Sequence, residues 1–161
     1  MLQHTSSIGN LEEKADISFH FHWAMVYSEL GKPYHFPNPL SSFMKHEYKK
    51  PSVYRWNISR EGHNTPEAYY IGEAQILCPN RLNNYIRPGP SQQTSIRIHS
   101  LLESYYKENY IVRIERLEFH EICLNDLTLR QADLSSRSVR CFLEEFFLTF
   151  YTAQGVKVLN K

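Results

Sequence analysis

The apolar residues of the second half of the chain repeat with a helical period in two places. Over 94–106 they are spaced three and four residues apart: Ile98, Leu101, Leu102 and Tyr105. A second stripe consists of Val139, Phe142, Leu143, Phe146 and Phe150. Because this spacing gathers apolar side chains on one face of a helix, we predict two amphipathic helices. Ser135 or Ser136 caps the second helix, and Gly155 ends it.

Runs of aromatic and β-branched residues predict three strands, over 52–58, 68–71 and 110–114. A polar segment joins the first two strands as a hairpin. A short helix then follows Pro79, a residue suited to the first turn of a helix. The order strand, strand, helix, helix, strand, helix predicts a small mixed α/β (α+β) domain.

Residues 1–47 precede this pattern and predict an N-terminal extension. Between Leu11 and Leu30 the apolar residues form patches of helical character, although 18–23 alternates as a strand does. We predict a helix here, ended by Gly31 and Pro33. The extension is a candidate for DNA binding or dimerisation, and the main domain is expected over 48–161.

The composition leaves the predicted fold unchanged and excludes some classes of function. The chain has 161 residues, of which 42% are hydrophobic, enough for one domain with a real core. A net charge of +1 excludes a protein that binds nucleic acid by bulk charge alone. Three scattered cysteines indicate a reducing compartment, and no apolar run is long enough to span a membrane. We expect a cytoplasmic protein without a membrane partner.

Several common functional motifs are missing from the sequence. It has no Gly-x-Gly-x-x-Gly, no phosphate-binding loop of the Walker type, no His-Glu-x-x-His and no Gly-x-Ser-x-Gly. His20 and His22 have a spacing that places both on one face of a strand, but no third metal ligand accompanies them. A structural or surface role is the better interpretation of this pair.

Two tyrosines, an arginine and a glutamate form the most informative set. Tyr54 and Tyr70 lie on the two strands of the hairpin, Arg81 on the next helix and Glu144 on the last helix. Arginine can stabilise the charge of a phosphoryl transition state, and a carboxylate can hold a divalent cation. A tyrosine with a lowered pKa can take a proton from water. These residue types suit phosphodiester hydrolysis.

Each of these residues also has a plainer interpretation. The tyrosines can be ordinary half-buried strand residues, and Arg81 a solvated helix arginine. Glu144 is different, because on a helical wheel it lies near Phe147 and Leu148, where an unpaired carboxylate is costly. Glu145 lies on the surface side of the same helix. We therefore favour Glu144 over Glu145 as the metal ligand.

Four sequence motifs, in this order, resemble the signature of the GIY-YIG nuclease superfamily over about residues 50–161. They are Ser52-Val53-Tyr54, Tyr70-Ile71-Gly72-Glu73-Ala74, Arg81-Leu82-Asn83-Asn84-Tyr85, and Leu143-Glu144 with Phe147-Leu148 followed by Leu159-Asn160. Two departures stand out: Ser52 replaces the first glycine, and Glu73 stands where many members have a lysine or a small residue. The resemblance implies a small three-stranded, mainly antiparallel sheet flanked by helices.

The resemblance also implies a role for each residue in a DNA endonuclease. Glu144 would bind Mg²⁺, for which Mn²⁺ can substitute, and Tyr54 would be the general base. Tyr70 would position water or phosphate, and Arg81 would stabilise the transition state. Gly72, Tyr85 and Asn160 would support the site. Tyr85 would orient Arg81.

The expected partner is double-stranded DNA. Arg87 and Arg97 are candidate DNA-binding residues within 81–116, a segment rich in arginine. A chain this short must read DNA with its own loops or as a homodimer, which favours a small restriction-type or phage-type endonuclease. The alternative function keeps the same fold without catalysis, as a nucleic-acid-binding or assembly module.

Overall fold

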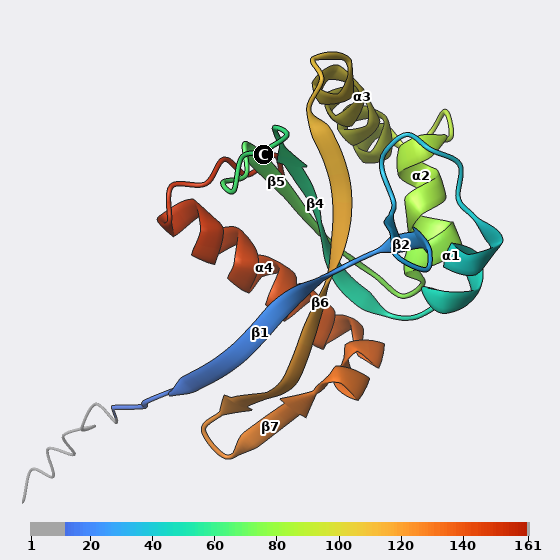
Figure 1. The fold of residues 1–161 in the computed structure, drawn as a ribbon. Helices are drawn as coiled ribbons and strands as arrows, with labels where there is room; N and C mark the ends of the chain where they lie inside the picture. Colours follow the sequence, from blue (N-terminus) through green and yellow to red (C-terminus); the bar gives the residue numbers. More distant parts are fainter. Residues whose placement is uncertain (1–11, 161) are drawn as a thin grey trace, which may run out of the picture.

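The protein has an α+β fold in which one antiparallel sheet of five strands separates two groups of helices (Figure 1). The computed structural model describes residues 12–160. The strands are β1 (Ile17–Met25), β2 (Tyr27–Glu29), β3 (Lys32–Pro33), β4 (Ser52–Ser59), β5 (Ala68–Ala74), β6 (Ile111–Leu124) and β7 (Leu127–Arg130). The helices are α1 (Ser42–Glu47), α2 (Leu82–Ile86), α3 (Gln93–Lys107) and α4 (Arg137–Ala153). An irregular helical turn (Leu77–Arg81) precedes α2, and a 3₁₀ turn (Gln131–Ser135) precedes α4.

The main sheet has the order β1-β6-β4-β5, with β7 also paired to β6, and β2 and β3 form a separate hairpin. All pairs are antiparallel. Strand β6 is long because its first half pairs with β4 and its second half with β7, while β1 follows it on the other side. The register of β1 and β6 shifts between Phe19 and Phe21, which marks a β-bulge.

The structure confirms several predicted elements and corrects two predictions. The helices expected over 94–106 and after Ser136 are α3 and α4, and the predicted hairpin is β4–β5. The helix predicted between Leu11 and Leu30 is wrong, because residues 17–25 form strand β1. Its alternating aromatic residues pack one face of the strand against α4, a pattern of period two. Residues 1–11 of the predicted extension lie outside the described part of the chain.

The prediction of a three-stranded sheet is also wrong, because the sheet has five strands. The two additional strands of this sheet are β1 and β7, and both pair with β6. The third predicted strand was expected to end near Ile114, but β6 continues to Leu124. Pairing partners that are distant in sequence extend the strand, and a local pattern cannot reveal them.

Alternate side chains of β4 and β5 build two cores on opposite faces of the sheet. One face, which includes Tyr54 and Trp56, packs against α1, α2 and α3. The other, which includes Val53 and Ile71, packs against α4. The two helix groups therefore reach the β5 edge from opposite sides (Figure 1). Within the described residues, no helix is both long enough and apolar enough to cross a membrane.

Candidate functional site

Three tyrosine side chains are linked by their hydroxyl groups on the α2 side of the sheet. In the β4–β5 register Tyr54 lies opposite Gly72, and Tyr70 lies opposite Trp56. The hydroxyl oxygens of Tyr54 and Tyr85 are 2.5 Å apart, and the Tyr85 hydroxyl donates to that of Tyr70 at 3.4 Å. The exposed fraction rises along the chain of phenols, from 0% for Tyr54 to 2% for Tyr85 and 7% for Tyr70. The predicted tyrosines are thus brought together, with Tyr85 between them.

Burial determines the protonation state of this cluster. It raises the pKa of Tyr54 well above the ordinary value of 10.0, the neighbouring phenols raise it further, and the charge of Arg81 opposes the shift. Burial also raises the pKa of Tyr85. Both side chains are therefore neutral phenols at neutral pH, and Tyr54 keeps its proton in this state of the protein.

Gly72 leaves room for the Tyr54 side chain. A Cβ atom at this position would lie 2.4 Å from the Tyr54 hydroxyl oxygen and 2.5 Å from the ring carbon that bears it. The two residues are direct cross-strand partners, so the ring of Tyr54 lies over the bare backbone of Gly72. The glycine of the Tyr70-Ile71-Gly72 motif thus has a steric role in placing the first tyrosine.

Arg81 lies where the irregular turn Leu77–Arg81 passes into α2. It lines a groove of about 350 Å³ together with the end of β5, the two residues that follow it, the irregular turn and α2: Ala74, Gln75, Ile76, Asn80 and Asn84. Burial lowers the pKa of its guanidinium, but the phenols of Tyr54 and Tyr85 and the carboxylate of Glu73 outweigh burial and raise it. Arg81 is therefore a permanent positive charge in a groove of mixed polar and apolar lining, and it couples to the nearby tyrosines.

Glu144 lies on α4, half-buried, on the other side of the β5 edge. Burial raises its pKa from 4.5 to about 7, the carboxylates of Glu73 and Glu145 raise it further, and Arg81 opposes the shift. Arg81 thus interacts electrostatically with both the phenols and the acidic group. Glu145, by contrast, is exposed.

Sequence reasoning missed the pair Glu73 and Arg140. Arg140 is only 3% exposed, and its Nε donates to Glu73 Oε2 at 2.7 Å. Its Nη1 donates to Gln75 Oε1 and to the carbonyl oxygens of Leu134 and Ser135. This arginine fixes Glu73 near Glu144. A signal was present, because Arg140 lies three residues before Leu143 on the buried stripe of α4.

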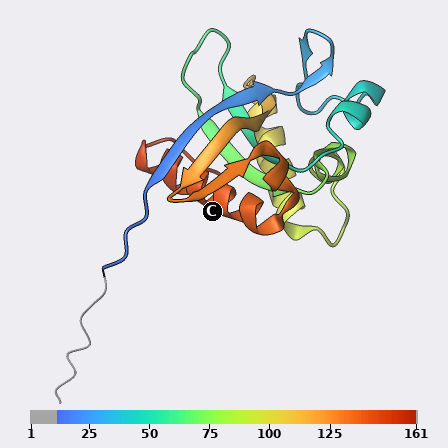
Figure 2. The same cartoon turned by 90° about the horizontal axis from the view of Figure 1, so that it is seen from below.

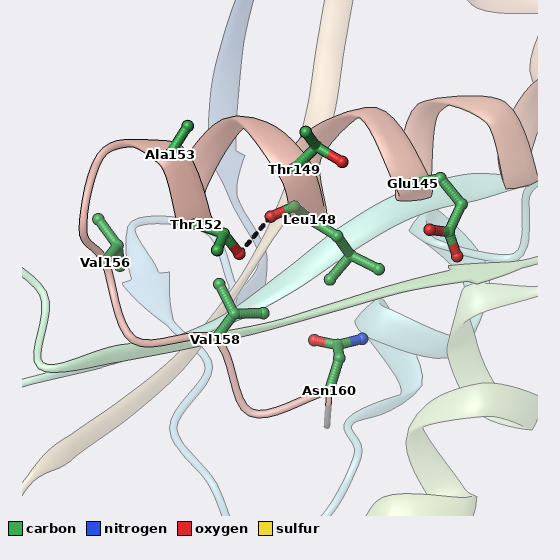
Figure 3. Close-up of a pocket in the computed structure, with 8 residues that line it drawn as sticks. All are labelled: Glu145, Leu148, Thr149, Thr152, Ala153, Val156, Val158 and Asn160. Carbon is green, nitrogen blue, oxygen red and sulfur yellow. Dashed lines mark hydrogen bonds between the residues drawn. The ribbon is translucent and has the colours of Figure 1, made fainter.

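Asn160 fastens the C-terminal segment to the outer edge of β5. Its Oδ1 accepts from the Ile71 N–H at 2.9 Å, and its Nδ2 donates to the Ile71 carbonyl at 2.6 Å. The same side chain lines a largely apolar pocket of about 500 Å³ between α4 and the C-terminal segment, with Glu145 at its rim (Figure 3). Asn160 therefore holds the Tyr70-Ile71-Gly72 strand in place, which is a supporting position.

Of the remaining predicted residues, Tyr85 belongs to the tyrosine cluster, whereas Arg87 and Arg97 lie outside it. Tyr85 was expected to orient Arg81, but its hydroxyl is hydrogen-bonded to the two other tyrosines. Arg87 is exposed at the end of α2, where it lines a separate pocket with Asn83. Arg97 donates from Nη1 to the Leu159 carbonyl at 3.1 Å and so joins α3 to the C-terminal segment. Contacts of either arginine with DNA stay a prediction.

The donor set limits which metal the site can hold. Within residues 12–160 no three His, Cys, Asp or Glu side chains gather as a metal cluster. Mg²⁺ does not require such a cage, because it keeps several waters and is commonly bound by one or two carboxylates and substrate phosphate. Glu144 fits that chemistry: its carboxylate is half-buried beside Glu73 and Glu145, an arrangement that a divalent cation would stabilise.

Comparisons with protein-family models, with curated proteins and with solved structures found no match. The resemblance to GIY-YIG nucleases therefore stays an interpretation of the motifs and of their placement.

Proposed function

We propose that this protein is a divalent-metal-dependent DNA endonuclease with a GIY-YIG-like site. The observation that supports the proposal most strongly is the position of Arg81. Its charge couples to the phenols of Tyr54, Tyr70 and Tyr85 on one side of the sheet and to the carboxylates of Glu73 and Glu144 on the other. These are the residue types that phosphodiester hydrolysis needs, and Arg81 lies in an open groove at this edge of the sheet.

In this proposal each charged group has a separate chemical role. Arg81 binds the scissile phosphate in the groove and stabilises the negative charge that develops on its oxygens. Glu144 is the protein ligand for Mg²⁺ or Mn²⁺, and when bound, the cation neutralises phosphate charge and assists the leaving oxygen. Glu73, held in place by its ion pair with Arg140, raises the pKa of Glu144.

The tyrosines supply oxygen atoms at defined positions. Because the Tyr85 hydroxyl donates to the Tyr70 oxygen, the hydrogen of Tyr70 is free to bond to water or phosphate. Tyr54 is the candidate general base, and it accepts a proton only as phenolate. The charge of Arg81 favours that form, whereas burial opposes it. The base function of Tyr54 therefore requires its pKa to fall when substrate and cation bind.

A plasmid-cleavage assay tests the proposal. We expect supercoiled plasmid to be nicked or linearised with Mg²⁺ or Mn²⁺ and to stay intact with EDTA. Arg81→Ala should abolish cleavage, whereas Arg137→Ala, which removes an arginine from the start of α4, should not. Intact plasmid under all divalent-cation conditions, with every DNA sequence tried, would contradict the proposal.

The full burial of Tyr54 favours one alternative function. A phenol with 0% exposure and a raised pKa is the state expected of a structural residue. The protein would then be a catalytically inactive nucleic-acid-binding or assembly module of the same fold. Salt-dependent DNA binding without cleavage would favour this alternative.

A further inference from the structure

The two edges of the main sheet differ in whether another segment of the chain pairs with them. At the β5 edge the C-terminal segment adds backbone contacts, with Tyr69 bridged to Val158 and the Asn160 amide bonded to Ile71. At the other edge lies β1, the end strand of the order β1-β6-β4-β5, which is the long blue strand in Figures 1 and 2. Among residues 12–160 no strand pairs with the outer side of β1. A nine-residue edge without a partner is unusual, because such edges readily accept another strand.

The outward backbone groups of β1 can be identified from the hydrogen bonds at its two ends. The Val26 N–H donates to the Ile114 carbonyl, and the Asp16 carbonyl accepts from the Asn125 N–H, so these two groups point toward β6. The direction alternates along an antiparallel strand, and the register shift occurs on β6, which has the extra residue. The odd-numbered residues therefore present their N–H and C=O groups outward: Ile17, Phe19, Phe21, Trp23 and Met25.

An apolar flank of α4 runs beside this open edge. Phe146 packs against Phe19, and Phe150 packs against Phe21. Phe142, one turn earlier on the same face of α4, is 41% exposed, and Ile17 at the start of β1 is 51% exposed. Glu144 lies on the opposite flank of the helix, where it couples to Glu73 of β5. The open strand edge and the aromatic flank thus form one continuous surface on the side away from the candidate site.

The sequence of β1 is complementary to itself under a two-fold axis. With the axis at Phe21, the central residue of the strand, Phe19 lies opposite Trp23 of the second copy and Ile17 opposite Met25. The polar face pairs Ser18 with Ala24 and His20 with His22, and residues 17–25 include no Asp, Glu, Lys or Arg. In this pairing apolar side chains lie opposite apolar side chains, and no two charged groups of the same sign lie opposite each other.

We propose that a second copy of this chain binds along β1, in an antiparallel two-fold dimer centred on Phe21. The dimer joins the two main sheets into one continuous sheet and covers the flank of Phe142, Phe146 and Phe150 with its symmetry mate. An isologous interface of this kind closes on itself and stops at two chains. The proposal does not depend on nuclease activity, and it leaves both candidate sites open because they lie at the far β5 edges.

The molar mass in solution tests the dimer first. Light scattering after gel filtration of the full chain at micromolar concentration should give about twice the chain mass of 19.1 kDa. Phe142→Lys and Ile17→Lys should each raise the dissociation constant by at least about tenfold, because each places a charge in the apolar interface. Tyr106→Lys is the matched control, since Tyr106 is an aromatic residue with 50% exposure on α3. A monomeric wild-type protein, or a dimer that tolerates both changes as well as the control, would overturn the proposal.

Disulfide cross-linking tests the register directly. Residues 20 and 22 of opposite copies form a non-hydrogen-bonded pair, with Cα atoms about 4.5 Å apart, which is within the range for a disulfide. In a background with Cys123→Ser and Cys141→Ser, a mixture of His20→Cys and His22→Cys proteins should cross-link under diamide, which takes up the two electrons and two protons of the thiols. Either protein alone should stay uncross-linked. A mixture that does not cross-link, or a single variant that cross-links alone as fully as the mixture does, would overturn the proposed axis.

Discussion

At the scale of single residues, the candidate site depends on a contact between a tyrosine and a glycine on neighbouring strands. Tyr54 is fully buried, and its ring lies where a Cβ atom on Gly72 would be. The ring cannot move aside cheaply, because it packs against Tyr85 and its hydroxyl is bonded there. The glycine is therefore required by packing and not by backbone conformation.

We predict that Gly72→Ala lowers the free energy of unfolding by about 1–3 kcal/mol, the usual cost of overpacking a core. Gly89→Ala is the matched control, because a Cβ atom there would meet its nearest neighbour at 3.6 Å, an ordinary contact distance. Chemical denaturation of both variants measures the effect. Equal stability of the two would show that Tyr54 does not need the space above Gly72.

A second prediction concerns Glu144, whose pKa in the folded protein is about 7 against an ordinary value of 4.5. The folded state binds the proton more tightly, so this group's contribution to stability is full below pH 4.5 and is lost as the pH rises to about 7. Glu144→Gln removes the dependence. In EDTA the variant should exceed the wild type in stability above pH 7 by about 1–2 kcal/mol, allowing for solvent screening of a half-buried group.

Denaturation curves of wild type, Glu144→Gln and Glu145→Gln across this pH range provide the test. The exposed Glu145 serves as the control on the same helix turn. The advantage of Glu144→Gln should disappear below pH 4.5, where the wild-type carboxyl is protonated. An advantage that is the same at every pH would contradict the raised pKa.

Tyr54→Phe separates catalysis from structure at this site. The change removes one oxygen and keeps the ring, so we expect folding and Ca²⁺-supported DNA binding to persist. If Tyr54 is the general base, single-turnover cleavage should fall by about two to four orders of magnitude. Near-normal cleavage by this variant would exclude that role, even in a functioning nuclease.

At the scale of the elements, Arg140 of α4 connects three parts of the chain. It bonds to Glu73 and Gln75 at the end of β5 and to the carbonyls of the 3₁₀ turn that precedes its own helix. One buried guanidinium thus fixes the orientation of α4, and with it the position of Glu144 relative to β5. A guanidinium suits this position because its five donors can satisfy several acceptors at once.

We predict that Arg140→Met costs about 3–5 kcal/mol of stability, because it leaves the Glu73 carboxylate without its buried partner. The double variant Arg140→Met with Glu73→Leu should lose less than the sum of the two single changes. A double-mutant cycle by denaturation measures this coupling. Strictly additive losses would mean that the two side chains do not stabilise each other.

The elements that the sequence predicts correctly are those whose pattern is local. The stripes of α3 and α4 are set by spacings of three and four residues within one helix. Strand β1 was mistaken for a helix because scattered apolar residues around it outweighed the alternation of Phe19, Phe21 and Trp23. The alternation becomes decisive only with the partner strand and α4 in place.

The sequence also predicts only part of the candidate site, namely the residues that belong to local motifs. The motifs indicated Tyr54, Tyr70 and Arg81, and the structure places their side chains at one edge of the sheet. The buried pair of Glu73 and Arg140 was not predicted, because the two residues are 67 positions apart and neither belongs to a local pattern. Only the folded arrangement shows that one holds the other beside Glu144.

At the scale of the whole molecule, the two edges of the main sheet have different proposed roles. The β5 edge, sealed by the C-terminal segment, gathers the tyrosines, Arg81 and Glu144. The β1 edge is open and lies beside the aromatic flank of α4. A dimer formed along β1 would place the two candidate sites at opposite ends of one continuous sheet.

The comparison of Glu144→Gln with Glu145→Gln in Mg²⁺-dependent DNA cleavage tests the central claim most directly. The two residues are neighbours on α4, but only Glu144 is half-buried and coupled to Glu73 and Arg81. We predict that Glu144→Gln abolishes cleavage while DNA binding in Ca²⁺ persists, and that Glu145→Gln largely keeps its activity. Full activity of the Glu144→Gln protein, or loss of activity only in Glu145→Gln, would contradict the account.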